Sequence, residues 1–492
     1  MEHFSVVIVG AGISGLSAAC HLKAQCPNTS FAILEARPRI GGTWDLFKYP
    51  GVRSDSDMYT LGFDFKPWSI AKSIAEAPII LDYLNETVEE HQLSKHIQLE
   101  QKVISASWSS RGAQWLLTVV HEGQLRQVSC QFLFMGSGYY SYENPFTPEI
   151  PGLGSFAGPV IHPQQWPDSL DYSAKRVAVI GSGATAMTLV PAMAETAEHV
   201  TMIQRSPTYV VSRPSVDKIA NWLRRWLPRE WAYNLTRFKN IQMQRLFYKR
   251  SRVAPEKLKQ LLLKGVRQAL GPSYDINKHF NPSYNPWDQR ICLIPDSDLY
   301  RTIRSGKTDV VTGHIDTVTD NSVKMSSGEE VPADILVTAT GLTLQLLGGV
   351  QFDLDGEPVH FSEHLTYKGM MCSGLPNLIN TFGYVNASWT LRADLNSKFL
   401  CRVLQHMGET GTQIVTPVLR DFEVNMPRKP WVESFTPGYI KRAIESFPKQ
   451  GTHYPWQNTQ DVGLDMKDIA TARLEDGVLQ FTRADAPQRS AA

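Results

Sequence analysis

Two glycine-rich loops, each placed directly after an apolar run, limit most strongly how this chain can fold. The first loop, residues 10–15, reads Gly-Ala-Gly-Ile-Ser-Gly and follows the β-branched run 5–9. The second loop, residues 181–186, reads Gly-Ser-Gly-Ala-Thr-Ala and follows the apolar run 176–180. Each loop leads into a helical pattern, and this order of strand, glycine turn and helix is typical of a dinucleotide-binding unit. The sequence therefore predicts an α/β fold with two Rossmann-like dinucleotide-binding domains.

The first loop is predicted to bind FAD or NAD and not NADP. In such a loop the first glycine makes the tight turn, the second lets the backbone approach a pyrophosphate, and the third lets helix and strand pack closely. The next predicted strand ends at Glu35, where a carboxylate accepts hydrogen bonds from ribose hydroxyls and repels a 2′-phosphate. A packing turn without a ligand is the alternative. The residues assigned to this nucleotide are Gly10, Gly12, Ser14, Gly15 and Glu35.

The second loop is predicted to bind NADPH. Its third glycine is replaced by Ala186, whose methyl group still fits a contact between helix and strand. Arg205 stands where the first unit has its ribose-binding acid, and a guanidinium there can bind a 2′-phosphate in bidentate fashion. A surface arginine without a ligand is the alternative. The residues assigned to NADPH are Gly181, Ser182, Gly183, Ala184, Thr185, Ala186, Met187, Arg205 and Ser206.

Composition narrows the class of protein further. The chain has 492 residues, too many for a single core, and its net charge of +1 provides no overall field that would attract nucleic acid. Six cysteines occur without a Cys-x-x-Cys pair, which argues for a reducing compartment and against a zinc site or a redox disulfide. Without a recognisable signal peptide or a long apolar run, the expected protein is a cytoplasmic enzyme that needs no metal.

A connector between the two loops carries a recognisable pattern. Residues 156–167 contain Phe156, Gly158, His162 and the pair Trp166-Pro167. With two prolines and no regular apolar period, this stretch is predicted to be neither strand nor helix. The order Phe-x-Gly-x-x-x-His-x-x-x-Trp-Pro resembles the fingerprint of the type I Baeyer–Villiger monooxygenases. A loop packed by its own aromatic side chains is the alternative.

The segment 49–58 combines a Pro-Gly turn with unlike charges, a composition that also suits a solvated loop. It is similar to the active-site loop of the ethionamide-activating branch of that family. The resemblance implies that Asp55 lies near the flavin ring and pairs with a catalytic arginine. It also implies that Arg53 and Ser54 line the nicotinamide side.

Arg290, at the start of a predicted strand, matches the family's catalytic arginine. Its charge persists at any working pH and can stabilise a flavin peroxide anion. Many family members have a lysine directly before this arginine, whereas this chain has Gln289. The NADPH preference is therefore expected to depend more strongly on Arg205.

Further residues are assigned to FAD in the first domain. The Gly41-Gly42 backbone and the flat ring of Trp44 suit a flavin, although a lone tryptophan is more often a core residue. The resemblance places the backbone of Val103 against the adenine and the segment 381–390 near the flavin. The additional residues assigned to FAD are Gly42, Thr43, Trp44, Asp45, Leu46, Val103 and Trp389.

The resemblance implies a definite reaction. NADPH reduces FAD, dioxygen adds at flavin C4a, and the resulting peroxide converts a ketone into an ester or lactone, with sulfoxidation as a side activity. The expected partners are a small ketone and O2. A flavin-containing N- or S-monooxygenase is the alternative enzyme, but Trp166-Pro167 favours ketone oxidation. A non-catalytic, nucleotide-binding redox sensor is the alternative from another class.

The predicted domains interrupt one another along the chain. Residues 211–284 are predicted to form a helical insertion, broken by proline and glycine into several short helices. The segment 217–264 holds thirteen Lys or Arg residues against three acidic ones, with interspersed aromatics, so peripheral membrane contact stays open. The predicted ranges are 1–145 and 343–492 for the FAD domain with its C-terminal tail, and 146–210 and 285–342 for the NADPH domain.

Overall fold

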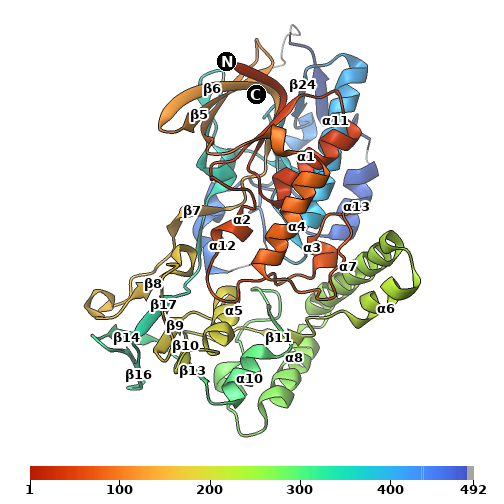
Figure 1. Ribbon diagram of the computed structural model, residues 1–492. Coiled ribbons are helices and arrows are strands. Elements are labelled where there is room, and N and C mark those ends of the chain that lie inside the picture. The colour runs from red at the N-terminus through yellow and green to blue at the C-terminus, as the bar shows by residue number, and fades with distance from the viewer. Residues whose placement is uncertain (434, 436, 472, 485–492) are drawn as a thin grey trace.

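The computed structural model describes residues 1–433, 435, 437–471 and 473–484 (Figure 1). The predicted C-terminal tail reaches residue 492, and its part from residue 485 lies outside the described residues. Two separate sheets organise the chain. One glycine loop follows a strand of the first sheet, and the other follows a strand of the second sheet. The carboxyl edges of the two sheets therefore position the two nucleotide sites.

The first sheet contains nine strands in the order β20-β19-β4-β5-β6-β1-β2-β3, with β23 paired to β6. Strand β1 is parallel to both β2 and β6, and Val9 pairs with Leu34 and with Met135. The carboxyl ends of these three strands therefore meet at one edge. The strands are β1 (Glu2–Val9), β2 (Phe31–Leu34), β3 (Ile97–Gln98), β4 (Lys102–Ser109), β5 (Gln114–His121), β6 (Gln124–Met135), β19 (Gln351–Leu354), β20 (Glu357–Pro358) and β23 (Leu378–Asn380).

The second sheet is parallel throughout, in the order β13-β10-β9-β17-β8. Its central strands β9 and β17 read as nearly continuous apolar runs, as expected for strands that are covered on both faces. The fingerprint connector is not wholly irregular as predicted, since Val160 and Ile161 pair with Leu336 and Val337 of β17. The strands are β8 (Val160–Ile161), β9 (Arg176–Ile180), β10 (His199–Gln204), β13 (Thr308–Thr312) and β17 (Ile335–Thr338).

Four helices lie between β11 (Val210–Arg213) and β12 (Cys292–Pro295), which pair with each other. They are α6 (Lys218–Trp226), α7 (Arg229–Val253), α8 (Pro255–Leu270) and α9 (Ile276–His279). Helix α7 has 25 residues, so the prediction of short helices is wrong for this element. Prolines occur next to its ends, at 228 and 255, and therefore do not interrupt it. In Figure 1, α6 and α7 lie side by side at the edge of the molecule.

The C-terminal part of the chain returns to the first sheet. Helix α11 (Trp389–Thr410) packs against α1 (Ile13–Gln25), the helix that follows the first glycine loop. The remaining helices include α2 (Thr43–Leu46), α3 (Met58–Leu61), α4 (Ala77–Glu90), α5 (Ala184–Met193), α10 (Asp298–Arg304), α12 (Gly438–Ala443) and α13 (Val462–Thr471). The remaining strands are β7 (Tyr140–Pro145), β14 (Ile315–Val318), β15 (Ser322–Met325), β16 (Glu330–Pro332), β18 (Leu342–Leu344), β21 (Thr366–Tyr367), β22 (Met371–Cys372), β24 (Ile414–Pro417) and β25 (Leu479–Thr482).

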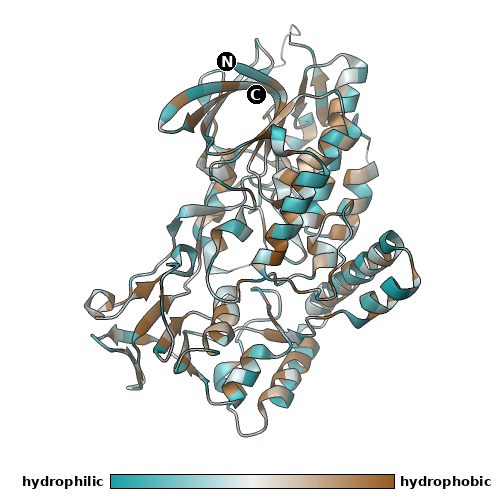
Figure 2. Cartoon of the chain, viewed as in Figure 1, coloured by the Kyte–Doolittle hydropathy of each residue, from teal (hydrophilic) through white to brown (hydrophobic). Residues whose placement is uncertain are grey.

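Hydrophobic residues gather on the strands of the second sheet, while α6 and α7 carry hydrophobic and hydrophilic residues intermixed (Figure 2). Buried Val179 of β9 and Met202 of β10 belong to one hydrophobic core with Leu189 of α5. Among the described residues, no helix combines the length and apolarity that crossing a membrane would require.

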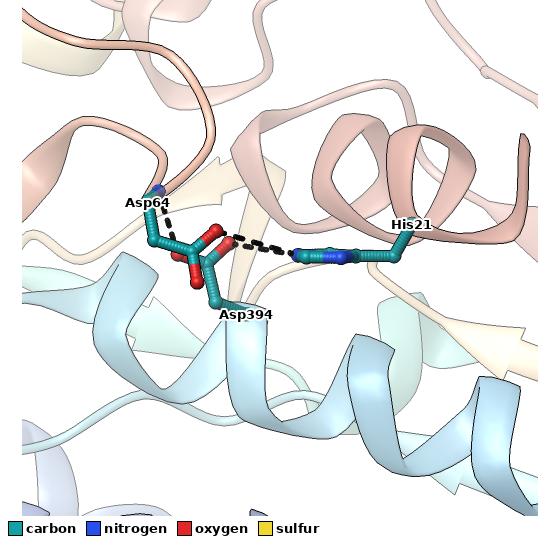
Figure 3. A group of neighbouring side chains, drawn as sticks. All are labelled: His21, Asp64 and Asp394. Atoms are coloured by element: carbon teal, nitrogen blue, oxygen red, sulfur yellow. Dashed lines mark hydrogen bonds and ion pairs between the residues drawn. The ribbon is translucent and has the colours of Figure 1, made fainter. Parts of the chain in front are cut away.

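A network of charges fastens α7 to the first domain, and Figure 3 shows three of its members, His21, Asp64 and Asp394. His21 Nε2 lies 3.6 Å from Asp394 and 3.8 Å from Asp64, and Arg237 of α7 lies 3.2 Å from the other oxygen of Asp394. Burial raises the pKa of Asp394, but His21, Arg237 and Ser17 lower it below its ordinary value overall. The three ligand-type side chains could surround a metal ion geometrically. Arg237 and Lys398 already neutralise the two carboxylates, so we interpret the group as an ion-pair network.

Candidate active site

A cavity of about 870 Å³ lies where the carboxyl edge of the first sheet faces the second sheet and the helical insertion. Its wall includes Gly10, Glu35 and Trp44 from the first domain, Thr185 from the second loop, and Arg290. Met243 and Phe247 of α7 also line it. One continuous space therefore joins both predicted nucleotide sites to the helical insertion.

The first glycine loop is shaped by two close approaches of the backbone. Gly10 has φ of +102°, and a Cβ atom there would lie 2.8 Å from the carbonyl oxygen of Gly136. A Cβ atom on Gly15 would lie 1.8 Å from the carbonyl oxygen of Gly10. Neither position has room for a side chain, because Gly10 packs against the backbone that follows β6 and Gly15, in the first turn of α1, packs against Gly10.

The residues around this loop fit a flavin dinucleotide. Helix α1 begins after Gly12 without a side-chain cap and without an acidic residue in its first turn, so its N–H groups remain available to an anion. Glu35 accepts hydrogen bonds from the backbone N–H groups of Ala11 (2.6 Å) and Arg37 (3.0 Å). Burial raises the pKa of Glu35, and these two N–H groups oppose that rise. The carboxylate is thus held rigidly in the cavity wall.

Other residues assigned to FAD are divided by the structure. Gly42, Thr43, Trp44 and Val103 line the cavity. Asp45 and Leu46 are not in the cavity wall, and the Asp45 carboxylate forms ion pairs with Arg37 and Arg39. Asp45 thus folds the segment after Glu35 onto α2.

Trp389 and Ser14 are brought together from opposite ends of the chain. The indole Nε1 of Trp389 donates a hydrogen bond to Ser14 Oγ at 2.7 Å. Its ring stacks on Tyr139 with a centroid distance of 5.0 Å. All three side chains line the cavity, so the start of α11 closes one side of the space next to α1.

The second loop resembles the first in its environment. Helix α5 begins after Gly183, again without a side-chain cap and without an acidic residue in its first turn. Ala184 and Thr185 line the cavity, while Ala186 is fully buried and Met187 nearly so. Gly181, Ser182 and Gly183 lie beside the cavity and are not in its wall.

Arg205 and Ser206 directly follow β10 and are exposed. Within the described part of the chain, Arg205 forms no ion pair with an acidic side chain. Its guanidinium therefore remains available to an anionic ligand, as a site for a 2′-phosphate requires. Burial and backbone contacts restrain its neighbour Gln204, whose Nε2 donates to the carbonyl oxygen of His279 at 2.7 Å and to Thr312 Oγ1 at 2.9 Å.

Arg290 and Asp55 form an ion pair in the cavity wall, with Nη1 and Oδ2 separated by 3.0 Å. Arg290 precedes β12, and Asp55 lies in the loop before α3. The Arg290 side chain is 35% exposed and lines the cavity. Burial acts to lower the pKa of Arg290, but Tyr439, Asp55 and Tyr139 raise it overall. The guanidinium is therefore a permanent positive charge.

The neighbours of Asp55 connect different parts of the chain. Arg53 Nη1 lies 2.7 Å from Asp298 Oδ2 at the start of α10. This ion pair connects the loop of Asp55 to the domain of the second sheet. Ser54 is buried, and its hydroxyl donates to the carbonyl oxygen of Ser56 at 2.8 Å. Asp57 accepts a hydrogen bond from Asn240 of α7 at 2.8 Å. These contacts hold the loop rigidly beside Arg290.

The fingerprint connector, residues 156–167, does not line the cavity. It contacts the two segments, at β7 and β18, in which the chain passes between the two sheets. His162 Nε2 donates to the carbonyl oxygen of Gly341 at 3.2 Å, and its Nδ1 accepts from the backbone N–H of Gln164 at 3.2 Å. Gln164 Nε2 donates to the carbonyl oxygens of Ser141 and Tyr142. Burial lowers the pKa of His162, in keeping with this neutral tautomer. The paired crossings β7 and β18 are thereby held in one arrangement.

Several residues of the site were missed by sequence reasoning. Tyr439 of α12 interacts with Arg290 through its side chain, yet the two are far apart in the sequence. Asn240, Met243, Gln244 and Phe247 of α7 also line the cavity. Their spacing of three or four residues would have indicated a shared helical face, but not the cavity that this face borders.

Comparisons with known proteins place these features in a wider context. The flavin-binding monooxygenase-like family model matches residues 73–404, and an NAD(P)-binding Rossmann-like domain model matches residues 8–69. The FAD-containing monooxygenase EthA of Mycobacterium tuberculosis strain H37Rv is 49% identical over 487 residues, which cover 99% of each chain.

Solved structures show the same fold. An oxidized steroid monooxygenase bound to NADP has a TM-score of 0.77 at 21% identity, covering 98% of this chain and 100% of that one. The polycyclic ketone monooxygenase of Thermothelomyces thermophila has a TM-score of 0.76 at 19% identity, covering 98% and 90%. Together with the two sheets, these matches confirm the predicted α/β fold with two Rossmann-like domains.

Proposed function

Because the chain belongs to the flavin-binding monooxygenase-like family, we propose that this flavin-dependent NADPH monooxygenase is a Baeyer–Villiger enzyme. It would convert ketones into esters or lactones. The observation that carries the proposal is the ion pair of Arg290 and Asp55 in the wall of a cavity bordered by both glycine loops. The likeness of fold to a polycyclic ketone monooxygenase supports it.

The residues that would hold FAD are the first loop, the Glu35 carboxylate and the wall formed by Trp44 and Trp389. The second loop and Arg205 would hold NADPH. Bound FAD supplies the chemistry of two-electron transfer from NADPH and of oxygen activation. The roles of the chain's own residues follow from their positions.

Arg290 would act as a preorganised charge in this reaction. Asp55 and Tyr439 orient its guanidinium before any substrate binds, so little reorganisation is needed when negative charge develops on oxygen. The same cation can polarise a ketone carbonyl in the cavity. Tyr139, Trp389 and Phe247 line the same cavity, and such aromatic surface would favour a site with little water, in which electrostatic interactions are stronger.

The proposal is tested by product analysis with a panel of linear and cyclic ketones under labelled dioxygen. We expect esters or lactones that carry one labelled oxygen atom, with one NADPH consumed for each. A matched panel of sulfides and tertiary amines tests the alternative enzyme. Formation of sulfoxides or N-oxides without any ester from any ketone would overturn the ketone assignment while leaving the family unchanged.

The coenzyme preference gives a second test. Replacing Arg205 with alanine should raise KM for NADPH about 10- to 100-fold, because charged hydrogen bonds to the 2′-phosphate are lost. KM for NADH, which lacks that phosphate, should change little and serves as the internal control. Steady-state kinetics with both coenzymes measure this. Equal losses with NADPH and NADH would show that Arg205 does not recognise the phosphate.

A further inference from the structure

Helices α6 and α7 expose an unusual amount of aromatic surface. Trp222 is 59% exposed, Trp226 73%, Trp231 67% and Phe238 62%. Rings exposed to this degree leave on the order of 500 Å² of apolar surface open, comparable to the largest patch on a typical monomer. Packing within the described part of the chain does not explain why these four positions carry aromatic residues.

The exposed residues follow helical spacing. Ile219, Trp222 and Trp226 share one face of α6, and Trp231, Leu235 and Phe238 share one face of α7. The two helices pack against each other at the edge of the molecule (Figure 1). We call the exposed apolar residues of the pair the insertion patch: Ile219, Trp222, Trp226, Trp231, Leu235, Phe238 and Leu246.

Positively charged side chains lie on the same two helices as the insertion patch. No ion pair within the described part of the chain engages the exposed side chains of Lys218, Arg225, Lys249 and Arg250. Other cations of the same helices are neutralised, such as Lys239 by Asp217 and Arg245 by Asp461. Because the whole chain has a net charge of only +1, this concentration of unpaired cations is local.

The insertion patch borders the cavity. Ile219 and Met243 are each about half exposed, yet both line the cavity, so they lie where the cavity meets the surface. Val216, also exposed, lines it beside them. A lipophilic molecule at the patch would therefore need to move only a short way along apolar side chains to reach the interior.

We propose that the insertion patch docks on an anionic lipid bilayer and places the mouth of the cavity at the membrane surface. Exposed tryptophan and aliphatic side chains between cations are the pattern of a helix that lies in the interface. A second copy of the chain is disfavoured as the occupant, since it would bring the same positive charges together. A nucleic acid would leave Ile219, Leu235 and Leu246 without suitable contacts, because aliphatic side chains do not stack on bases.

Vesicle flotation of the FAD-containing enzyme tests this inference without depending on the reaction catalysed. We expect binding to vesicles of phosphatidylglycerol and phosphatidylcholine, and much weaker binding to phosphatidylcholine alone. The double variant Trp222→Ser, Trp226→Ser should bind at least about tenfold more weakly. The double variant Arg225→Glu, Lys249→Glu should lose about fivefold or more for each reversed charge.

Two matched controls change exposed residues elsewhere. Phe422→Ser and Lys324→Glu should bind vesicles like the parent. NADPH oxidation in solution should be unchanged in all variants, because none of these residues lines the cavity. Absence of vesicle binding, or binding that none of the patch variants weakens, would overturn the proposal. So would self-association that the tryptophan variant abolishes in an enzyme that binds no lipid.

Discussion

Replacing Arg290 with methionine should lower ester formation by about a hundred- to a thousandfold while leaving reduction of the flavin by NADPH within a few fold of the parent. Methionine keeps much of the length of the side chain but removes the positive charge next to Asp55. The loss falls on oxygen transfer because that step develops negative charge on oxygen. Anaerobic stopped-flow measurement of flavin reduction, combined with product analysis in air, separates the two steps.

Two further variants control this experiment. Arg304→Met removes an exposed arginine of α10 and should leave both steps unchanged. Asp55→Asn keeps the shape of the partner but removes its charge, so it should reduce ester formation less than the loss of Arg290 does. NADPH consumption in the Arg290 variant should continue with release of hydrogen peroxide. Ester formation at the parental rate in Arg290→Met would remove this residue from the mechanism.

Replacing Gly15 with alanine should destabilise the first domain by more than about 3 kcal/mol and abolish FAD binding. The new methyl group would lie 1.8 Å from the carbonyl oxygen of Gly10, and the clash cannot be relieved by a side-chain rotation because the backbone fixes the positions of both atoms. The loop must move, and the N-terminus of α1 must move with it. Flavin content after purification and thermal unfolding measure the two effects.

Two other glycines provide matched controls. At Gly12 the new Cβ atom would meet Gly42 Cα at 3.6 Å, so Gly12→Ala should fold but bind FAD weakly, because the methyl group occupies the approach of the pyrophosphate. At Gly408 in α11 there is open space, so Gly408→Ala should be neutral or slightly stabilising. Normal flavin content in Gly15→Ala would refute the steric argument.

The two glycine loops show how far sequence reasoning reaches. Strand, turn and helix are contiguous in the chain, so the motif could be identified without the fold. For the third position, the sequence predicted that a methyl group fits in the second loop, but it did not show that the first loop has no room for one. Ala186 is accommodated in the buried contact of the second loop, whereas Gly15 has no room for the same methyl group. At Gly15 the methyl group would meet the carbonyl oxygen of Gly10, and the direction of that carbonyl group cannot be read from the sequence.

Asp45 shows what the spacing of residues along the chain does not predict. It follows a double glycine close to the cavity, and its assignment to FAD stays a prediction. The structure pairs its carboxylate with Arg37 and Arg39. The orientation of a side chain in a short helix depends on which cations lie within reach, and the spacing of residues along the chain does not determine this.

By itself the sequence determined the class of fold, the presence of two nucleotide loops and the contrast between Glu35 and Arg205 after corresponding strands. All of these depend on short, contiguous segments. The pairing of Arg290 with Asp55, 235 residues apart, was implied only by the resemblance to a known family, and the tertiary structure brings the two side chains together. Only the tertiary structure decided that Tyr439 joins them and that α7 borders the same cavity. Such meetings depend on how sheets and helices pack, because a close approach between distant segments leaves no periodic trace in the chain.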